Sequence, residues 1–207
     1  MDKAQDWQHC NSETFWREIA ACSHVLQIYE NDQALLNLLE DFVVGGISVG
    51  DCVILIATEW HLAALEKRLR DQGLDTKTLY VACQYIPLNA KEMLEKFMVN
   101  GWPDEGLFVE AISSVFNRIR DNKQQVRAFG EMVSLLWGQG NGAATIRLEH
   151  LWNAFFEKET FSLLCAYPQD KFPDHATSAL SCICKAHSRI ITNSGEARFD
   201  LAYQDVY

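Results

Sequence analysis

The sequence predicts an α/β fold, a three-layer sandwich in which helices cover both faces of a mostly parallel central sheet. Strand-like apolar runs alternate with helical segments along the chain, which is the pattern of a doubly wound sheet. In the stretch 126–167, two apolar strands are joined by a helical crossover. Such nearly continuous apolar strands are typical of a parallel sheet that is buried on both faces.

The first half of the chain predicts two strands, each followed by a helix. The strands are HVLQIY (24–29) and CVILIAT (52–58), of which the second is the clearer buried strand. The first helix is expected to begin at the capping residues 30–32 and to close at Gly45 and Gly46. The second helix is expected to stop at Gly73.

The second half continues the alternation. We expect a short strand within 79–87 ended by Pro87, helices at 91–101 and 107–120, a strand at 126–131, helices on either side of the turn GQGNG, a strand at 161–167, a helix at 177–187 and a strand at 188–192. The chain is interpreted as a single domain, 1–207, with its core at about 22–192, an N-terminal helix at 12–22 and a C-terminal tail at 193–207. The sequence does not predict the strand order.

Composition excludes several classes of protein. Hydrophobic residues make up 48% of the 207 positions, which excludes an intrinsically disordered chain. The net charge of -10 repels phosphate backbones and anionic lipids, so we expect no direct binding of nucleic acid or membrane. No apolar run approaches the ~20 residues of a membrane span. The seven cysteines are odd in number and lie mostly in apolar runs, which favours reduced thiols and a cytoplasmic location.

Polar side chains gather where the predicted strands end. The carboxyl ends of parallel strands share one edge of the sheet, so these residues are expected to form a ligand crevice there. The candidate ligand-binding residues are Tyr29, Glu30, Glu59, His61, Glu131 and Tyr167. His24 and His187 are secondary candidates, because they begin their strands and should face away unless a bend brings them round.

Each candidate also has a purely structural interpretation. Glu30 and Glu59 could simply cap the helices that follow them. Tyr29 and Tyr167 could be core aromatic residues whose hydroxyls reach the rim. Among the candidates, Glu131 indicates a ligand-binding site most clearly. It lies between apolar neighbours, and a buried carboxylate needs a partner or a raised pKa.

The motifs of several enzyme classes are missing from the sequence. No HxxxH, HExxH or CxxC spacing supports a metal site at Glu59, His61 or Glu131, so we expect no metal and no cofactor. No GxxxxGK[ST] loop for nucleotide phosphates occurs, and no GxSxG elbow for a nucleophilic serine. Catalytic residues are therefore not predicted.

Six ordered blocks resemble the MEDS domain family, the methanogen/methylotroph dichloromethane-regulator sensory domain. The blocks are HVLQIYEND, GDCVILIATEWH, KFMVNGWPD, VRAFGEMVSLLW with GNGAATIRLEHLWN, FSLLCAYP and ICKAHSRI, which together span about 22–192. The resemblance implies a RecA-like, P-loop-related fold whose phosphate-binding loop has degenerated. It also implies a prokaryotic signal-input domain for small organic molecules.

The residues that match the family blocks include most of the candidates. They are His24, Tyr29, Glu30, His61, Gly130, Glu131, Tyr167, His187 and Ser188. Asn89 departs from the pattern, where an Asp is expected. Relatives are often fused to a DNA-binding or histidine-kinase module, and neither kind of segment is found in these 207 residues.

We therefore expect a non-catalytic sensory domain that binds a small organic ligand at the carboxyl edge of the sheet. It would signal to an output protein, either a kinase or a transcription regulator. One alternative is an interaction scaffold without a small ligand, which would need an exposed apolar patch. Another is a residual enzyme that uses Glu59 or Glu131 as a base.

Overall fold

The computed structural model describes residues 23–119, 124–171 and 182–191, and a parallel sheet lies at its centre. The strands of this sheet are β1 (His24–Tyr29), β2 (Cys52–Ala57), β3 (Tyr85–Asn89), β6 (Val126–Gly130), β7 (Ser162–Pro168) and β8 (Arg189–Ile191). Their order is β3–β2–β6–β7–β1–β8, and every neighbouring pair is parallel. The α/β fold with a parallel sheet is thus confirmed.

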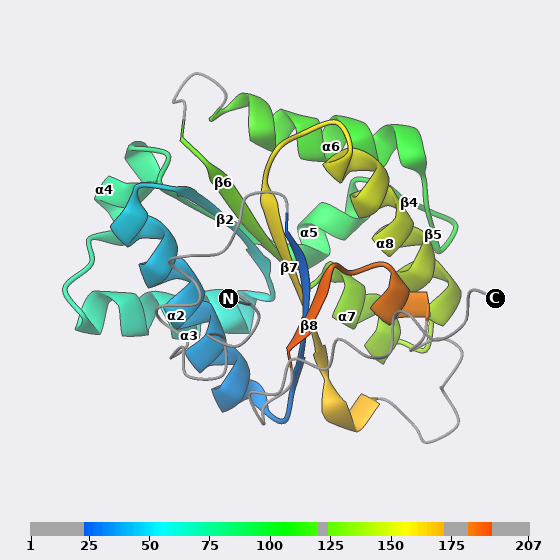
Figure 1. Cartoon of the computed structure of the whole chain (residues 1–207), viewed down its shortest axis with the longest axis horizontal. Helices are drawn as coiled ribbons and strands as arrows, with labels where there is room; N and C mark the ends of the chain where they lie inside the picture. Colours follow the sequence, from blue (N-terminus) through cyan, green and yellow to red (C-terminus); the bar gives the residue numbers. More distant parts are fainter. Residues whose placement is uncertain (1–22, 120–123, 172–181, 192–207) are drawn as a thin grey trace, which may run out of the picture.

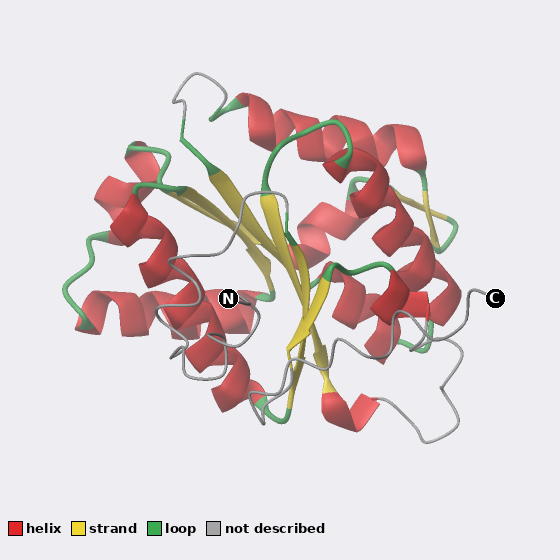
Figure 2. Ribbon diagram, in the orientation of Figure 1, coloured by secondary structure: helices red, strands yellow, loops and turns green. Residues whose placement is uncertain are grey.

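Helices cover both faces of the sheet (Figures 1 and 2). They are α2 (Asp32–Val49), α3 (Glu59–Asp71), α4 (Thr76–Val81), α5 (Ala90–Glu95), α6 (Glu105–Asn117), α7 (Met132–Gly138) and α8 (Gly142–Phe156). A small hairpin of β4 (Met98–Val99) and β5 (Trp102–Pro103) precedes α6, and a short 3-10 turn, η3 (Gln169–Lys171), follows β7. The predicted N-terminal helix 12–22, the tail 193–207 and the first part of the predicted helix 177–187, residues 177–181, lie outside the described residues, whereas residues 182–185 are helical.

Two hydrophobic cores, one on each face, hold the layers together. On one face, α2 and α3 bury residues such as Leu39, Phe42 and Leu65 against the sheet. On the other, α5 to α8 bury a cluster rich in aromatic rings, which includes Phe108 and Trp152. Side chains of a strand alternate between the two faces, so each strand contributes to both cores.

The helix α2 runs beyond the predicted stop at Gly45 and Gly46. It ends instead at Gly50, whose φ of 85° supplies the left-handed cap. Gly46 serves close packing, because a Cβ there would lie 2.6 Å from Cγ2 of Val53 and 2.8 Å from Cδ of Arg127. The prediction was therefore wrong about the end of this helix, although it identified the glycines as special positions.

Two predictions between 79 and 101 were also wrong in detail. Asp75 caps α4 through its side chain, so residues up to Val81 are helical and the strand β3 begins only at Tyr85. Pro87 lies within β3, which tolerates it because β3 is at the edge of the sheet and, among the described strands, pairs with β2 alone. The helix predicted at 91–101 ends at Glu95, and the β4–β5 hairpin follows it.

Candidate functional site

The candidate site begins where β6 ends at the carboxyl edge of the sheet. Gly130 pairs with Ile56 of β2, and the next backbone N–H, that of Glu131, donates to the Ile56 carbonyl at 2.8 Å. Glu131 then occupies the position before α7, but its side chain makes no capping hydrogen bond to that helix. The carboxylate is directed instead to the connection between β2 and α3.

Both oxygens of the Glu131 carboxylate accept hydrogen bonds from this connection. Its Oε2 accepts the backbone N–H of Thr58 at 2.7 Å, and its Oε1 lies 2.8 Å from Nδ1 of His61. Thr58 is also the N-cap of α3, and its hydroxyl lies 2.7 Å from the same His61 nitrogen. Glu131 is only 3% exposed, so a carboxylate out of reach of bulk water ties β6 to the start of α3.

The second ring nitrogen of His61 points away from this pair. Its Nε2 is buried and has no hydrogen-bond partner within the described residues. Oδ1 of Asp32, in the first turn of α2, lies 3.7 Å from it, which is too long for a hydrogen bond. Burial lowers the pKa of His61, but the hydrogen bond and charge of Glu131, together with Asp32, outweigh burial and raise that pKa above 6.5. The contact with Glu131 thus stabilises the protonated ring, and in that form Nε2 carries a donor.

Tyr29 completes this group from the end of β1. Its side chain is 6% exposed, and burial raises the pKa of its hydroxyl, with further contributions from the charges of Glu131 and Asp32. We name Tyr29, Asp32, His61 and Glu131 the carboxyl-edge cluster. This cluster contains three of the six predicted ligand-binding residues, and Asp32 is an addition. The sequence could have indicated Asp32, because it follows a predicted strand closely, as the other candidates do.

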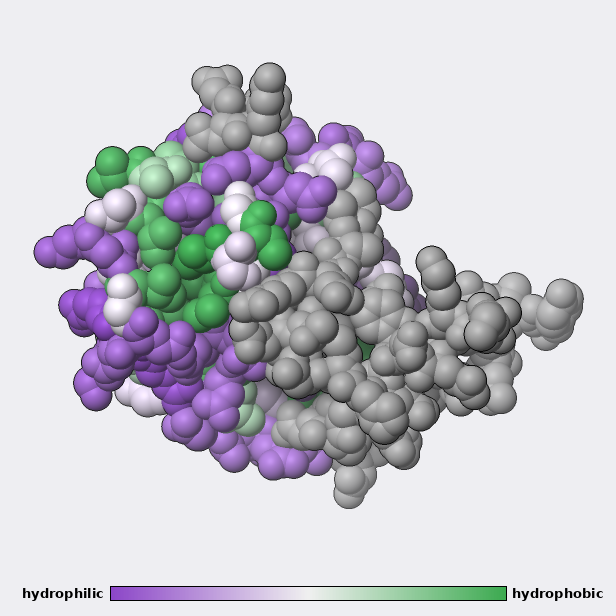
Figure 3. All heavy atoms as spheres, turned by 60° about the vertical axis from the view of Figure 1, so that its left-hand side comes forward, coloured by the Kyte–Doolittle hydropathy of each residue, from purple (hydrophilic) through white to green (hydrophobic). Residues whose placement is uncertain are grey.

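Glu30 and Glu59 flank this cluster without entering it. Both are exposed, and Glu59 lies in the first turn of α3. It lines a separate groove of about 480 Å³ between α3, α4 and β3, together with residues such as Tyr80 and Tyr85. Hydrophobic side chains gather on this side of the molecule (Figure 3), and exposed ones include Val81 of α4.

Tyr167 lies at the same edge of the sheet but belongs to the opposite face. Its ring packs in the core formed with α5 to α8, and its hydroxyl donates to Oε1 of Glu149 on α8. Burial raises the pKa of Tyr167, and the charge of Glu149 raises it further. The structure therefore separates Tyr167 from the carboxyl-edge cluster.

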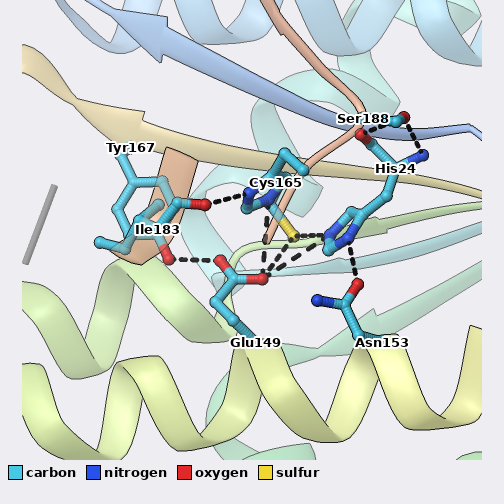
Figure 4. A network of polar contacts seen from close by, with 8 residues as sticks. His24, Glu149, Asn153, Cys165, Tyr167, Ile183 and Ser188 are labelled. Atoms are coloured by element: carbon cyan, nitrogen blue, oxygen red, sulfur yellow. Dashed lines mark hydrogen bonds and ion pairs between the residues drawn. The ribbon is translucent and has the colours of Figure 1, made fainter. Parts of the chain in front are cut away.

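His24 and Tyr167 both contact Glu149 in a second, buried polar group (Figure 4). His187 belongs to the same group, because its ring centroid lies 4.0 Å from that of His24 and its Nε2 lies 3.6 Å from Oε2 of Glu149. We name His24, Glu149, Cys165 and His187 the buried donor cluster. Burial lowers the pKa of both histidines to about 4, with the neighbouring His187 adding to the effect at His24. Burial also raises the pKa of Glu149 and of Cys165. The two histidines were expected to face away from the crevice, and the structure places them on the other face with Tyr167.

The comparisons with known proteins concern the fold and the family. Residues 23–187 match the MEDS family, described as the MEthanogen/methylotroph, DcmR Sensory domain. A solved structure from Pyrococcus horikoshii OT3, a structural study of PH0250, is similar with a TM-score of 0.53 and 14% identity. The alignment covers 88% of this chain and 87% of that chain, and at this identity it shows the fold alone. No curated protein matches the chain.

Within the described residues, none of the helices has the length and apolar character needed to cross a membrane.

Proposed function

Because the chain belongs to the MEDS family of sensory domains, we propose that it is a signal-input domain that binds a small organic ligand beside the carboxyl-edge cluster. The family supports the signal-input role, and the geometry of the cluster supports the location. The sheet's carboxyl edge is where open α/β sheets bind ligands.

The observation that carries the proposal is the buried Nε2 of His61. A buried polar atom without a partner costs free energy, and most such atoms in folded proteins are satisfied. Glu131 holds the ring by its other nitrogen at 2.8 Å and favours the imidazolium, so Nε2 offers a hydrogen-bond donor. The ligand would then present an acceptor, such as a carbonyl, hydroxyl or ether oxygen, to Nε2. Trp60, whose ring centroid lies 4.9 Å from that of His61, and Tyr29 would supply the apolar wall.

The same contacts favour sensing over catalysis. Both oxygens of Glu131 already accept hydrogen bonds from the protein, which leaves it poorly placed as a general base. Glu59, the other candidate base, is exposed and has no contact with the carboxyl-edge cluster among the described side-chain hydrogen bonds and ion pairs. A non-catalytic role is therefore part of the proposal.

A RecA-like ancestry with a degenerate phosphate loop also belongs to the proposal. Only Glu30 and Asn31 connect β1 to α2, and Asn31 caps the helix by accepting the Ala34 N–H at 3.0 Å. A phosphate-binding loop needs a longer glycine-rich connection at such a position. The short capped connection argues against phosphate binding after β1, and the RecA-like ancestry itself rests on the resemblance of the sequence blocks.

A second candidate, protein–protein interaction, is favoured by exposed hydrophobic side chains at the groove between α3 and α4. Tyr80 and Val81 line this groove and are 44% and 82% exposed. Such a surface could contact the output kinase or transcription regulator of a sensor, or serve a scaffold without a ligand. The buried cysteines support a reducing, cytoplasmic setting for either role.

Compound binding to matched variants tests the proposal. Protein purified from its own host is analysed by native mass spectrometry, and any co-purifying compound is titrated calorimetrically into the variants. We expect His61→Gln and Glu131→Gln to bind at least about tenfold more weakly, the loss of one hydrogen bond to a charged group. Glu59→Gln, which changes an exposed carboxylate at the same edge, should bind like the wild type. Equal affinity in all variants would contradict the proposed location, and loss of binding in Glu59→Gln alone would transfer the site to the α3–α4 groove.

A further inference from the structure

Four metal-ligand atoms converge in the buried donor cluster, and they come from four separate elements. His24 begins β1, Glu149 lies on α8, Cys165 lies in β7 and His187 precedes β8. Their donor atoms all lie within 4.8 Å of one another, and all four residues are buried. We propose that these four side chains form a binding site for a divalent transition metal, with Zn²⁺ the best fit.

The distances between the donors resemble the edges of a metal-centred tetrahedron. Zinc binds nitrogen and oxygen at about 2.0–2.1 Å and sulfur at about 2.3 Å, which corresponds to donor–donor edges of roughly 3.4–3.8 Å. Oε2 of Glu149 lies 3.6 Å from Nε2 of His24, 3.6 Å from Nε2 of His187 and 3.8 Å from Sγ of Cys165. Nε2 of His24 lies 3.5 Å from the same sulfur. These four of the six edges match those of a zinc site, and the remaining two, from His187 to His24 and to Cys165, are at most 4.8 Å.

The outer contacts orient the donors inward. Nδ1 of His24 lies 2.8 Å from Oδ1 of Asn153, and Nδ1 of His187 lies 2.7 Å from the carbonyl oxygen of Ile183 (Figure 4). Both partners are acceptors, so each Nδ1 carries the proton and each Nε2 presents a lone pair to the centre of the cluster. This is the arrangement that second-sphere groups impose on metal-binding histidines.

Two further contacts fit the same site. Tyr167 donates to Oε1 of Glu149, which holds the carboxylate with Oε2 directed at the other three donors. Nε2 of His187 is completely buried and has no hydrogen-bond partner within the described residues. A metal ion would satisfy this atom, whereas a buried and unpaired nitrogen costs stability.

Charge and coordination number favour zinc over other ions. A carboxylate and a thiolate contribute two negative charges beside two neutral imidazoles, and a divalent cation balances them. Thiolate and imidazole together select zinc-like metals over Mg²⁺ or Ca²⁺, and a carboxylate is a stronger fourth ligand than the weak axial group of a blue-copper site. Four protein donors leave no open position, which is typical of a structural site. The metal would fasten His187 and the following strand β8 to β1, β7 and α8.

The test uses the full chain and two pairs of matched variants. Metal content is measured by mass spectrometry after purification without chelator, and Co²⁺ is added to chelator-treated protein as a spectroscopic probe. We expect one metal equivalent per chain and a thiolate-to-Co²⁺ absorption band in the wild type. Cys165→Ala should lose the band, whereas Cys184→Ala, which changes another buried cysteine of the same face, should keep it. His187→Gln should lose the metal, whereas His150→Gln on the exposed side of α8 should keep it.

A milder variant keeps the test decisive if the variants that replace a metal-binding residue do not fold. Tyr167→Phe removes the hydroxyl that donates to Glu149 and keeps the ring, and the loss of such an outer contact weakens metal affinity by roughly 10- to 100-fold. A wild type that binds neither Zn²⁺ nor Co²⁺ would overturn the proposal. It would also be overturned by a Co²⁺ complex without the thiolate band, or by one that Tyr167→Phe leaves unchanged in affinity.

Discussion

Replacement of Glu131 by Gln removes the charge from the carboxyl-edge cluster and keeps the shape of the side chain. In the wild type, the carboxylate accepts hydrogen bonds from the Thr58 N–H at 2.7 Å and from His61 Nδ1 at 2.8 Å. The amide oxygen of Gln can still accept from Thr58. The amide nitrogen then faces His61, which must become neutral and accept through Nδ1.

The expected loss of stability follows from these two contacts. A hydrogen bond to a charged group contributes about 1.5–3 kcal/mol, and a neutral one about 0.5–1.5 kcal/mol. Each of the two bonds therefore weakens by about 1–1.5 kcal/mol, and the total loss is about 2–3 kcal/mol. For a domain of this size, 1 kcal/mol shifts the melting temperature by about 2–4 °C, so we expect Tm to fall by about 4–12 °C.

Thermal and urea unfolding, followed by circular dichroism, measure this loss. Glu59→Gln is the control, because an exposed carboxylate outside the cluster should change stability by less than about 0.5 kcal/mol. If the Tm of Glu131→Gln equals that of Glu59→Gln within experimental error, then Glu131 is not a buried charged acceptor and the reasoning about the cluster fails.

The remaining predictions concern pH, packing and nucleotides. The pKa of His61 is raised on folding, so the stabilisation it gives is complete below about pH 6.5 and is lost as pH rises through the folded pKa. The stability gap between wild type and Glu131→Gln should therefore shrink as pH rises above about 6.5, and a constant gap would contradict the ion pair. Gly46→Ala should destabilise by about 1–3 kcal/mol, because its Cβ meets β2 and Arg127, whereas Gly138→Ala has open space and should be neutral or slightly stabilising in the same unfolding assay. Incubation with Mg²⁺-ATP or Mg²⁺-GTP should give no turnover near ~1 s⁻¹, and turnover at that rate would favour the enzyme alternative.

The fold was predictable because its signals are local. Buried strands such as β2 are continuous apolar runs, and capping residues or glycines mark most helix ends, as Gly73 and Gly140 do with φ of 85° and 77°. The prediction that Gly46 ends the helix was wrong for the same reason. The role of Gly46 is close packing against β2 and β6, a tertiary contact that no neighbouring residue in the sequence indicates.

The candidate site was only partly predictable. Glu131, His61 and Tyr29 meet as expected, because the carboxyl ends of β6, β2 and β1 share one edge. Tyr167 does not join them, because its side chain lies in the core on the opposite face of the sheet. The sequence could not show this, because β7 is buried on both faces and its apolar run has no alternation to indicate which side chains point to which face.

The sequence indicated only half of the buried donor cluster, because His24 and His187 were secondary candidates whereas nothing indicated Glu149 or Cys165. Its four donors lie at positions 24, 149, 165 and 187, and no short motif spacing connects them. Only the strand order, which places β1 between β7 and β8, brings these residues together.

Native mass spectrometry of the protein from its own host tests the central claim, a small ligand at the carboxyl-edge cluster, most directly. We predict that the wild type and Glu59→Gln retain one small organic compound per chain, and that folded Glu131→Gln has lost it. Wild-type protein without any such compound, or Glu131→Gln that retains it at the same occupancy, would contradict the claim.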